Sequence, residues 1–323
     1  MSLPAEIDPH RTQRKPRSGH PQLTIEARGY GLIRDNMSRK LVERYWQAQD
    51  PYDPATLATS RHADWSADWP QSAERIPSHE ADVAIHGTYP GYPAHRLERT
   101  TGSDEVWRPL PTVLLWTPVR ITGASDMWIA EARLEYPEDG LWHAVASLEL
   151  RDGLVWRETV YYCRSFESPP WPDAFAEQAP AGLPVLLASV EHNAEAERLH
   201  SDAYARYLDI ARTDPGTAAR GLFQETAIVD RPQSGRRVAG VENIAQAYEA
   251  QRDVLPGRLR RLLKSGHVLL AESRLDHLND KWFLVTIAEF DQGKVARMTE
   301  YLAESYPAPE WRSGWVEPLT ENG

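Results

Sequence analysis

The stretch that decides the fold is Val155–Glu177, VWRETVYYCRSFESPPWPDAFAE, because it returns without a gap as Val295–Glu317, VARMTEYLAESYPAPEWRSGWVE. The two segments share Arg, Thr, Tyr, Ser, Pro, Trp and the final Glu in the same order. Similarity of this kind within one chain indicates a repeated structural unit. We therefore expect two related domains rather than one core.

Two further pairs of segments support the repeat. DWPQSAER at 68–75 returns as DRPQSGRR at 230–237, and EARLE at 131–135 returns as ESRLD at 272–276. The spacing between copies falls from 162 to 141 residues, so the first copy carries an insertion, which we place at about 88–112. Insertions of this length commonly form lids or contact surfaces. The predicted organisation is a partly disordered N-terminal extension 1–35, a first domain 36–177, a linker 178–190 and a second domain 191–318.

Within each copy, helical periodicity gives way to strand-like alternation. Residues 37–49 and 194–211 have apolar side chains at helical spacing, and an Asp-Pro pair at 53–54 and 214–215 marks a second helix in each copy. Strands are predicted at 127–136, 142–150 and 155–163, with hairpin turns at Asp139-Gly140 and Asp152-Gly153. Helices followed by an antiparallel meander predict an α+β fold with the helices packed on one face of a curved sheet.

Charge and composition exclude several classes of protein. The 323 residues carry a formal net charge of −11, which disfavours binding to nucleic acid or to an anionic membrane surface. A single cysteine, Cys163, cannot form an internal disulfide and fits a reducing compartment. No apolar run has the length of a signal-peptide core or a membrane span, so we predict a cytoplasmic protein that does not bind membranes.

The chain resembles the SnoaL-like branch of the nuclear transport factor 2-like superfamily. The resemblance rests on the order of elements, the Trp-Pro-Gln-Ser strand end, and the closing Arg-x-Thr-x-Tyr strand followed by Pro-x-Trp. It covers nearly all of the chain after residue 36. It implies two tandem cone-shaped domains, each with N-terminal helices on a curved antiparallel sheet. The superfamily includes polyketide cyclases, ketosteroid isomerases, limonene epoxide hydrolase and catalytically silent scaffolds, so the fold does not determine the reaction.

The resemblance to limonene epoxide hydrolase implies a catalytic group in the second copy. That enzyme places an Arg-x-Asp pair on one strand and a second acid on the closing strand, a pattern matched by Arg274, Asp276 and Glu300. Asp276 would then be the base or position water, Glu300 would be the acid, and Arg274 would keep Asp276 charged. A carboxyl paired with Arg stays ionised while burial can hold a proton on its neighbour, so the pair would supply one base and one acid.

The first copy offers Arg133 and Glu135 at the matching strand, and we predict that they bind substrate, but Val160 stands where the second copy has Glu300. Charged residues alternate along this strand in both copies. Such alternation is also typical of a solvated sheet face. The pattern therefore fits two interpretations, a set of acids in a pocket or a face in water.

Other polar and aromatic residues are predicted to contact the substrate: Trp69, His86, Trp142, Arg231 and Trp282. Trp69 and Arg231 occupy the strand end where ketosteroid isomerases carry their general base, and His86 ends a predicted short helix. A lone His or Trp is also commonly structural. The sequence contains no His-Glu-x-x-His motif, no complete dinucleotide fingerprint and no Gly-x-Ser-x-Gly elbow, so we predict acid–base chemistry without metal or cofactor.

Two functions fit these observations. The first is an enzyme of bacterial secondary metabolism that cyclises, isomerises or opens a ring, by epoxide-type or aldol-type chemistry, on a small, partly hydrophobic biosynthetic intermediate. The second is a non-catalytic ligand-binding or partner protein that docks another biosynthetic enzyme. Members of the superfamily that the chain resembles commonly dimerise through their sheets. The resemblance therefore implies that the two domains pack as a pseudo-dimer within one chain, giving a monomer or a homodimer.

Overall fold

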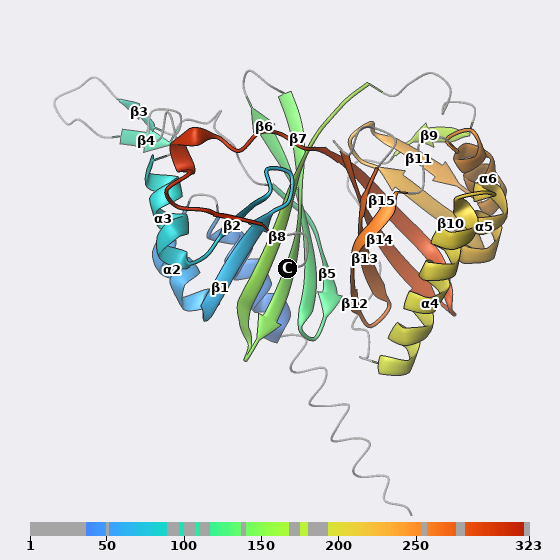
Figure 1. Ribbon diagram of the computed structural model, residues 1–323, viewed down its shortest axis with the longest axis horizontal. Helices are drawn as coiled ribbons and strands as arrows, with labels where there is room; N and C mark the ends of the chain where they lie inside the picture. The colour runs from blue at the N-terminus through green and yellow to red at the C-terminus, as the bar shows by residue number, and fades with distance from the viewer. Residues whose placement is uncertain are drawn as a thin grey trace, which may run out of the picture.

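The structure is a computed structural model that describes residues 37–49, 52–88, 97–99, 107–109, 117–136, 140–167, 175–179, 193–252, 257–275 and 282–319. The predicted extension 1–35, nearly all of the linker 178–190 and most of the 88–112 insertion lie outside these residues. Within the insertion, β3 (Leu97–Arg99) pairs with β4 (Trp107–Pro109). The two larger sheets lie side by side in the middle of the molecule, with helices on the two opposite flanks (Figure 1).

The first sheet has seven strands in the order β16-β2-β1-β8-β7-β6-β5. A helix over 37–47 precedes it, and the bounds of its other elements are α2 (Pro54–Ser60), β1 (Arg61–Trp69), β2 (Glu74–Ile76), α3 (His79–Thr88), β5 (Thr117–Ala124), β6 (Met127–Tyr136), β7 (Gly140–Arg151), β8 (Leu154–Arg164) and β16 (Glu317–Pro318). Neighbouring strands run antiparallel, except that β1 and β8 run parallel. Asp53 caps α2 by accepting hydrogen bonds from the backbone N–H groups of Ala55 and Thr56, as the Asp-Pro signal predicts.

The second sheet also has seven strands, in the order β12-β13-β14-β15-β10-β11-β9. Its elements are β9 (Ala176–Gln178), α4 (Ala194–Ala211), α5 (Pro215–Leu222), β10 (Phe223–Arg231), β11 (Arg236–Ala239), α6 (Val241–Glu249), β12 (Arg258–Ser265), β13 (Val268–Arg274), β14 (Trp282–Asp291) and β15 (Lys294–Glu304). Here too one pair, β10 and β15, runs parallel and the others antiparallel. The predicted α+β class, with helices packed on two sheets, is confirmed.

Hairpin turns fix the register of the long strands. Asp152 and Gly153, between β7 and β8, have φ values of 52° and 76°. Gln292 and Gly293, between β14 and β15, have φ values of 50° and 80°. Two consecutive residues with positive φ are what a two-residue type I′ turn requires, and this turn sets which residues of the two strands face each other.

Three groups of buried apolar side chains form the core. Two of them lie between a sheet and its own helices, on the face that we call the inner face; Tyr45 and Trp65 belong to the first and Tyr207 and Tyr248 to the second. The third lies between the two sheets, on their outer faces, and its members are Met127, Ile129, Val145, Tyr161, Cys163, Val268, Leu270, Phe283, Val285, Ile287, Tyr301 and Ala303. Removal of these side chains from water holds the two sheets together.

Buried ion pairs cross between the outer faces. Arg120 of β5 donates hydrogen bonds to Glu131 of its own sheet and to Glu289 of β14 in the other sheet. It also donates to the Thr299 hydroxyl at 3.1 Å, and the Tyr301 hydroxyl donates to Glu131 at 2.7 Å. Arg120 is thereby surrounded by partners from both halves of the chain.

Arg261 of β12 makes the corresponding contacts from the second sheet to the first. This residue donates to Glu149 of β7 and, at 2.9 Å, to the Thr159 hydroxyl of β8. Within its own sheet it lies 3.6 Å from Glu272, which accepts a hydrogen bond from Tyr161 at 2.9 Å. Each residue of this set lies 140 or 141 positions from its counterpart in the Arg120 set. The two sheets therefore meet through matching positions.

The segments that follow β8 and β15 cross to the opposite sheet. β9 follows β8 in the chain but pairs with β11 of the second sheet, while β16 follows β15 and pairs with β2 of the first. Residues 176–177, which lie inside the predicted first domain 36–177, thus belong to the second sheet. Each sheet is completed by a strand from the other half of the chain.

The repeated Pro-Gln-Ser segment holds this crossing together. Gln71 accepts a hydrogen bond from the Tyr162 N–H at 2.6 Å and donates to the carbonyl oxygens of Tyr162 at 2.9 Å and Glu304 at 2.7 Å. Gln233 bonds in the same way to β15 of its own sheet and to β8 of the other. One amide side chain thus joins the two closing strands at each of two places.

We expect Gln71→Ala to lower the free energy of unfolding by about 2 kcal/mol, because backbone groups of two buried strands lose their partner. Urea unfolding measures the loss. Gln246→Ala, at an exposed position of α6, is the matched control and should change stability by less than about 0.5 kcal/mol. Equal effects of the two substitutions would show that the Gln71 hydrogen bonds do not stabilise the crossing.

Candidate functional site

The inner face of the first sheet carries a buried carboxyl, Glu158 of β8. Its neighbours across the sheet are Leu148 of β7 and Ala67 of β1, both members of the apolar core. The residue is 5% exposed. A carboxyl in such surroundings must either keep its proton or find a partner.

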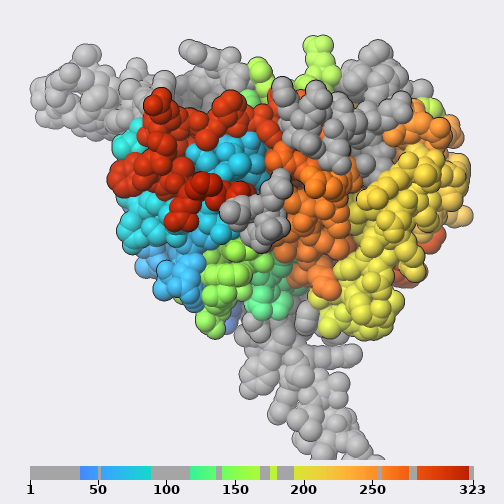
Figure 2. All heavy atoms as spheres, in the orientation of Figure 1, coloured from blue at the N-terminus to red at the C-terminus, as the bar shows by residue number. Residues whose placement is uncertain are grey.

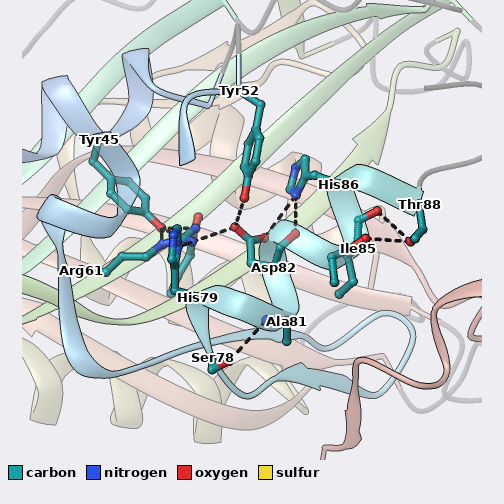
Figure 3. A network of polar contacts seen from close by, with 12 residues as sticks. Tyr45, Tyr52, Arg61, Ser78, His79, Ala81, Asp82, Ile85, His86 and Thr88 are labelled. Carbon is teal, nitrogen blue, oxygen red and sulfur yellow. Dashed lines mark hydrogen bonds and ion pairs between the residues drawn. The ribbon is translucent and has the colours of Figure 1, made fainter. Parts of the chain in front are cut away.

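Tyr45, from the helix over 37–47, is that partner. Its hydroxyl donates to Oε2 of Glu158 at 2.5 Å. The hydroxyl oxygen of Tyr45 accepts hydrogen bonds from Nε and Nη2 of Arg61, both at 3.2 Å. The Tyr45 hydroxyl therefore lies between the guanidinium group and the carboxyl group (Figure 3 shows Tyr45 and Arg61).

Arg61, the first residue of β1, is held on its other side by α3. Its Nη1 donates to Oδ2 of Asp82 at 2.7 Å and lies 2.7 Å from Nδ1 of His79 (Figure 3). Because a guanidinium group only donates, Nδ1 of His79 accepts, which puts the proton of the neutral imidazole on Nε2. The guanidinium also lies over the Trp65 ring, 3.6 Å from its centre.

Two further side chains connect Asp82 with the surface. The Tyr52 hydroxyl donates to Oδ2 of Asp82 at 2.8 Å, and Nδ1 of His86 lies 3.4 Å from Oδ1. Asp82 and His86 are four residues apart on α3, so they share one helix face. The His86 ring stacks on Tyr52 with 3.8 Å between centres, and its side chain is 31% exposed. The network thus runs from the buried Glu158 to a half-buried imidazole.

The surroundings give the two carboxyls different pKa values. Burial raises the pKa of Glu158 to about 7, against the opposing effect of Arg61. Burial also opposes ionisation of Asp82, but the hydrogen bond from His86 and the charge of Arg61 outweigh it and lower the pKa of this carboxyl. Burial and Arg61 together lower the pKa of His79. Near neutral pH, Asp82 is therefore ionised and Glu158 is divided between its two protonation states.

This arrangement suits proton transfer. A carboxyl with a pKa near the working pH can accept a proton in one step and return it in the next. Asp82 neutralises Arg61, so the guanidinium attracts the Glu158 carboxylate less strongly than an unpaired cation would. A pair of carboxyls with separated pKa values is the arrangement that acid–base enzymes use to assign an acid and a base.

The second sheet carries its own buried carboxyl, Glu300 of β15. Nε of Arg231 donates to its Oε2 at 2.9 Å, and the Tyr248 hydroxyl donates to its Oε1 at 2.7 Å. Nη2 of Arg231 also donates to the Gln251 side chain at 3.2 Å. The structure therefore brings together Glu300 and Arg231, two of the predicted site residues. Unlike Glu158, this carboxyl is in a direct ion pair.

The two buried carboxyls lie at different levels of their sheets. At the level of Glu158 the second domain is apolar: the residues that match Arg61, Asp82 and Glu158 are Phe223, Ile244 and Met298, all buried in the core. At the level of Glu300 the first domain has no matching ion pair. The residues that match Arg231, Tyr248 and Glu300 there are Trp69, His86 and Val160. Successive inner-face residues of a strand are about 7 Å apart. The two inner faces are therefore not copies of one site.

Arg274 of the predicted catalytic group does not lie beside Glu300. Arg274 lies opposite Phe283 on the outer face of the second sheet, with its guanidinium 4.0 Å from the centre of that ring, and its Nη1 donates to the Ser305 hydroxyl at 3.2 Å. Glu300 lies opposite Thr286 on the inner face. Because alternate residues of a strand point to opposite faces, the sheet separates Arg274 from Glu300. Asp276 lies outside the described residues.

The remaining predicted substrate-binding residues occupy varied surroundings. Arg133 and Glu135 lie on the exposed part of β6, with side chains 50% and 79% exposed and charged groups 3.9 Å apart, as expected for a solvated face. Trp142 and Trp282 are half-buried and pack against the inner-face cores of their own sheets. Trp69 is also half-buried, and the guanidinium of Arg312 lies over its ring at 4.4 Å.

Tyr45, Arg61, Asp82 and Glu158 were not identified from the sequence. A signal was nevertheless present in the comparison of the two copies. The three positions occupied by Phe223, Ile244 and Met298 in the second copy change together to Arg, Asp and Glu in the first. A charged set that replaces an apolar set at buried positions must be mutually paired, and such pairing is a mark of a functional site.

The part of the chain that the structure describes contains no group of three or more His, Cys, Asp or Glu side chains that could hold a metal ion. None of its helices combines the length and the apolar character that crossing a membrane requires.

No known protein-family profile and no curated protein matches the chain. Among solved structures it is similar to a nuclear transport factor 2-like protein of unknown function from Burkholderia xenovorans, with 27% identity, a TM-score of 0.35, and coverage of 39% of this chain and 98% of that one. It is also similar to a putative ketosteroid isomerase from Kribbella flavida, with 20% identity, a TM-score of 0.35, and coverage of 46% and 93%.

Proposed function

We propose that the chain is a cofactor-independent acid–base enzyme whose first domain moves a proton on a small, partly hydrophobic molecule. The observation that carries this proposal is the buried Glu158, with a pKa of about 7, beside the paired Arg61 and Asp82. Acid–base catalysis is most effective when the pKa of the group lies near the working pH. Isomerisation, cyclisation by an aldol step and opening of a strained ring are reactions of this kind.

Each residue of the site has a distinct role in the proposal. Glu158, as carboxylate, takes a proton from a carbon atom next to a carbonyl group and returns it elsewhere on the molecule. Tyr45 donates its hydrogen bond to the carboxylate and fixes its orientation. Arg61 holds the Tyr45 hydroxyl, while Asp82 balances the charge of Arg61. Together these contacts keep Glu158 in place while leaving its proton exchangeable.

The second domain has a supporting role in this proposal. Its Glu300 is already engaged by Arg231 and Tyr248, which suits the orientation of a ligand better than proton transfer. We also propose that the two domains are related copies that pack as a pseudo-dimer within the chain. The matching contacts of Arg120 and Arg261 across the outer faces support this relationship.

Deuterium exchange at carbon tests the proposal without the natural substrate. Enolisable ketones are incubated with the protein in D₂O at neutral pH, and incorporation is followed by mass spectrometry. We expect Glu158→Gln to lower the exchange rate at least about 100-fold, because an amide cannot accept the proton. Glu197→Gln is the matched control, a buried carboxyl of α4 in the second domain that accepts a hydrogen bond from the Gly266 N–H and has no role in the proposal, and it should retain exchange.

Three outcomes would count against this assignment. Exchange at the wild-type rate in Glu158→Gln would remove Glu158 from the chemistry. Loss of exchange in Glu300→Gln alone would move the chemistry to the second domain. Failure of the wild-type protein to exchange any ketone or to open simple epoxides would favour the alternative, a non-catalytic ligand-binding or partner protein.

A further inference from the structure

Residues 306–319, here called the C-terminal segment, leave the second domain and lie on the first (Figures 1 and 2, red). At its start the Tyr306 N–H donates to the Gln71 carbonyl at 3.0 Å, and at its end the Leu319 N–H donates to the Ala73 carbonyl at 2.8 Å. Between these points the 3₁₀ helix η3 (Glu310–Arg312) contacts α3. The segment therefore reaches the helix that carries Asp82 and His86.

Arg312 anchors the C-terminal segment. It is 7% exposed, and its Nε donates to both carboxylate oxygens of Glu74 in β2, at 3.2 Å and 3.1 Å. Its Nη2 donates to Glu74 as well and to the Ser72 hydroxyl at 3.3 Å, and the guanidinium lies over the Trp69 ring. A buried Arg with a carboxylate, a hydroxyl and an aromatic ring as partners fixes its segment in one position.

Arg312 links two of the elements that pack against α3. The helix contacts β1, β2 and η3. Two of these elements are held by Arg312 itself, since η3 contains it and β2 contains its partner Glu74. β2 also leads into α3 after only two residues, Pro77 and Ser78. Beside Arg312, the side chain of Trp311 packs against the inner-face core of the first sheet.

We propose that Arg312 is a positioning residue of the first domain's site, which holds α3 where Asp82 pairs with Arg61. The groups that face Glu158 in this site are Tyr45 from the helix over 37–47, Arg61 from β1, and Asp82 and His86 from α3. If α3 loosens, water reaches Glu158 and Arg61 loses its carboxylate partner. Both changes favour the ionised form of Glu158.

An infrared pH titration of the Glu158 carboxyl tests this inference, with its band assigned by difference from Glu158→Gln. Arg312→Gln should lower the titration midpoint by at least about one pH unit, and Arg312→Lys, which keeps the charge, should lie between this variant and the wild type. Arg220→Gln is the matched control, because it breaks the exposed ion pair with Glu242 in the second domain. It should leave the midpoint unchanged.

An unchanged midpoint in Arg312→Gln, or an equal shift in Arg220→Gln, overturns the inference. If Arg312→Gln does not fold, Trp311→Ala replaces it, because this change weakens the packing of η3 on the first domain. The titration midpoint of Glu158 should again fall. An unchanged midpoint in Trp311→Ala would also overturn the inference. The effect of Arg312 on catalysis rests on the proposed function, but the titration needs no substrate. Normal deuterium exchange in Glu158→Gln would thus end the proposed function and leave the role of Arg312 in place.

Discussion

Replacing Arg120 with Met is expected to lower the free energy of unfolding by about 3–5 kcal/mol. The change removes the cation that lies between Glu131 of the first sheet and Glu289 of the second, and both carboxyls remain buried. Because Met fills much of the same volume, the loss reports mainly the uncompensated charges rather than an empty space. Urea unfolding at neutral pH measures it.

Two further variants separate charge from packing. Arg120→Met combined with Glu131→Gln and Glu289→Gln removes the carboxyl charges as well and should recover most of the loss. Arg133→Met, on the exposed part of the first sheet, should remain within about 0.5 kcal/mol of the wild type. If Arg120→Met is as stable as Arg133→Met, the ion pairs across the outer faces do not hold the sheets together.

Glu158→Gln is expected to remove a fall in stability that the wild type shows as the pH rises. The pKa of this carboxyl is raised from 4.5 to about 7 in the folded protein, so the folded state binds more protons than the unfolded state between these values. The stability that Glu158 contributes is complete below pH 4.5 and is lost as the pH rises through 7. From about pH 4 to about pH 9, the variant should gain roughly 3 kcal/mol relative to the wild type.

Urea unfolding of both proteins across this pH range measures the gain. Burial also raises the pKa of Glu272 and Glu289, but both residues are present in the two proteins, so their contributions cancel in the difference. Glu135→Gln, at a side chain that is 79% exposed, is the control for a Glu-to-Gln change at the surface of the same domain. A difference between Glu158→Gln and wild type that stays constant with pH would mean that Glu158 is not held in its neutral form.

The elements of the fold are predictable because their signals are local. Asp53 caps its helix with its own side chain, and the Asp152-Gly153 turn needs only the positive φ values of two adjacent residues. The crossing of β9 and β16 has no such signal, since these strands span three and two residues and their pairing depends on where the two sheets meet. The Pro-Gln-Ser segment supports the predicted repeat, but nothing in its sequence indicates that its Gln side chain bridges the two halves of the chain.

The types of charged group in the candidate site were easier to predict than their location. An ionised carboxyl paired with Arg beside a protonatable carboxyl was expected in the second domain, whereas the structure has Asp82, Arg61 and Glu158 in the first. Arg274 and Glu300 were predicted to share one face of the second sheet but lie on opposite faces. A shift of one residue in the strand register moves a side chain to the other face, so a small error in the expected register is enough to separate them. Arg61 and Asp82 meet through packing of α3 near β1, which leaves no periodic pattern in the sequence.

The crossing of strands also sets the order in which a growing chain can finish its two halves. The ion-pair partner of Glu74 in β2 is Arg312, which is synthesised 238 residues later. Domains generally begin to fold as they leave the ribosome, the N-terminal one first. Here the half that is made first emerges with β2 as an open edge and α3 without η3, and it acquires both contacts only after the strands of the second half have followed. The half that starts folding first is thus completed only after residues 306–319 have been synthesised.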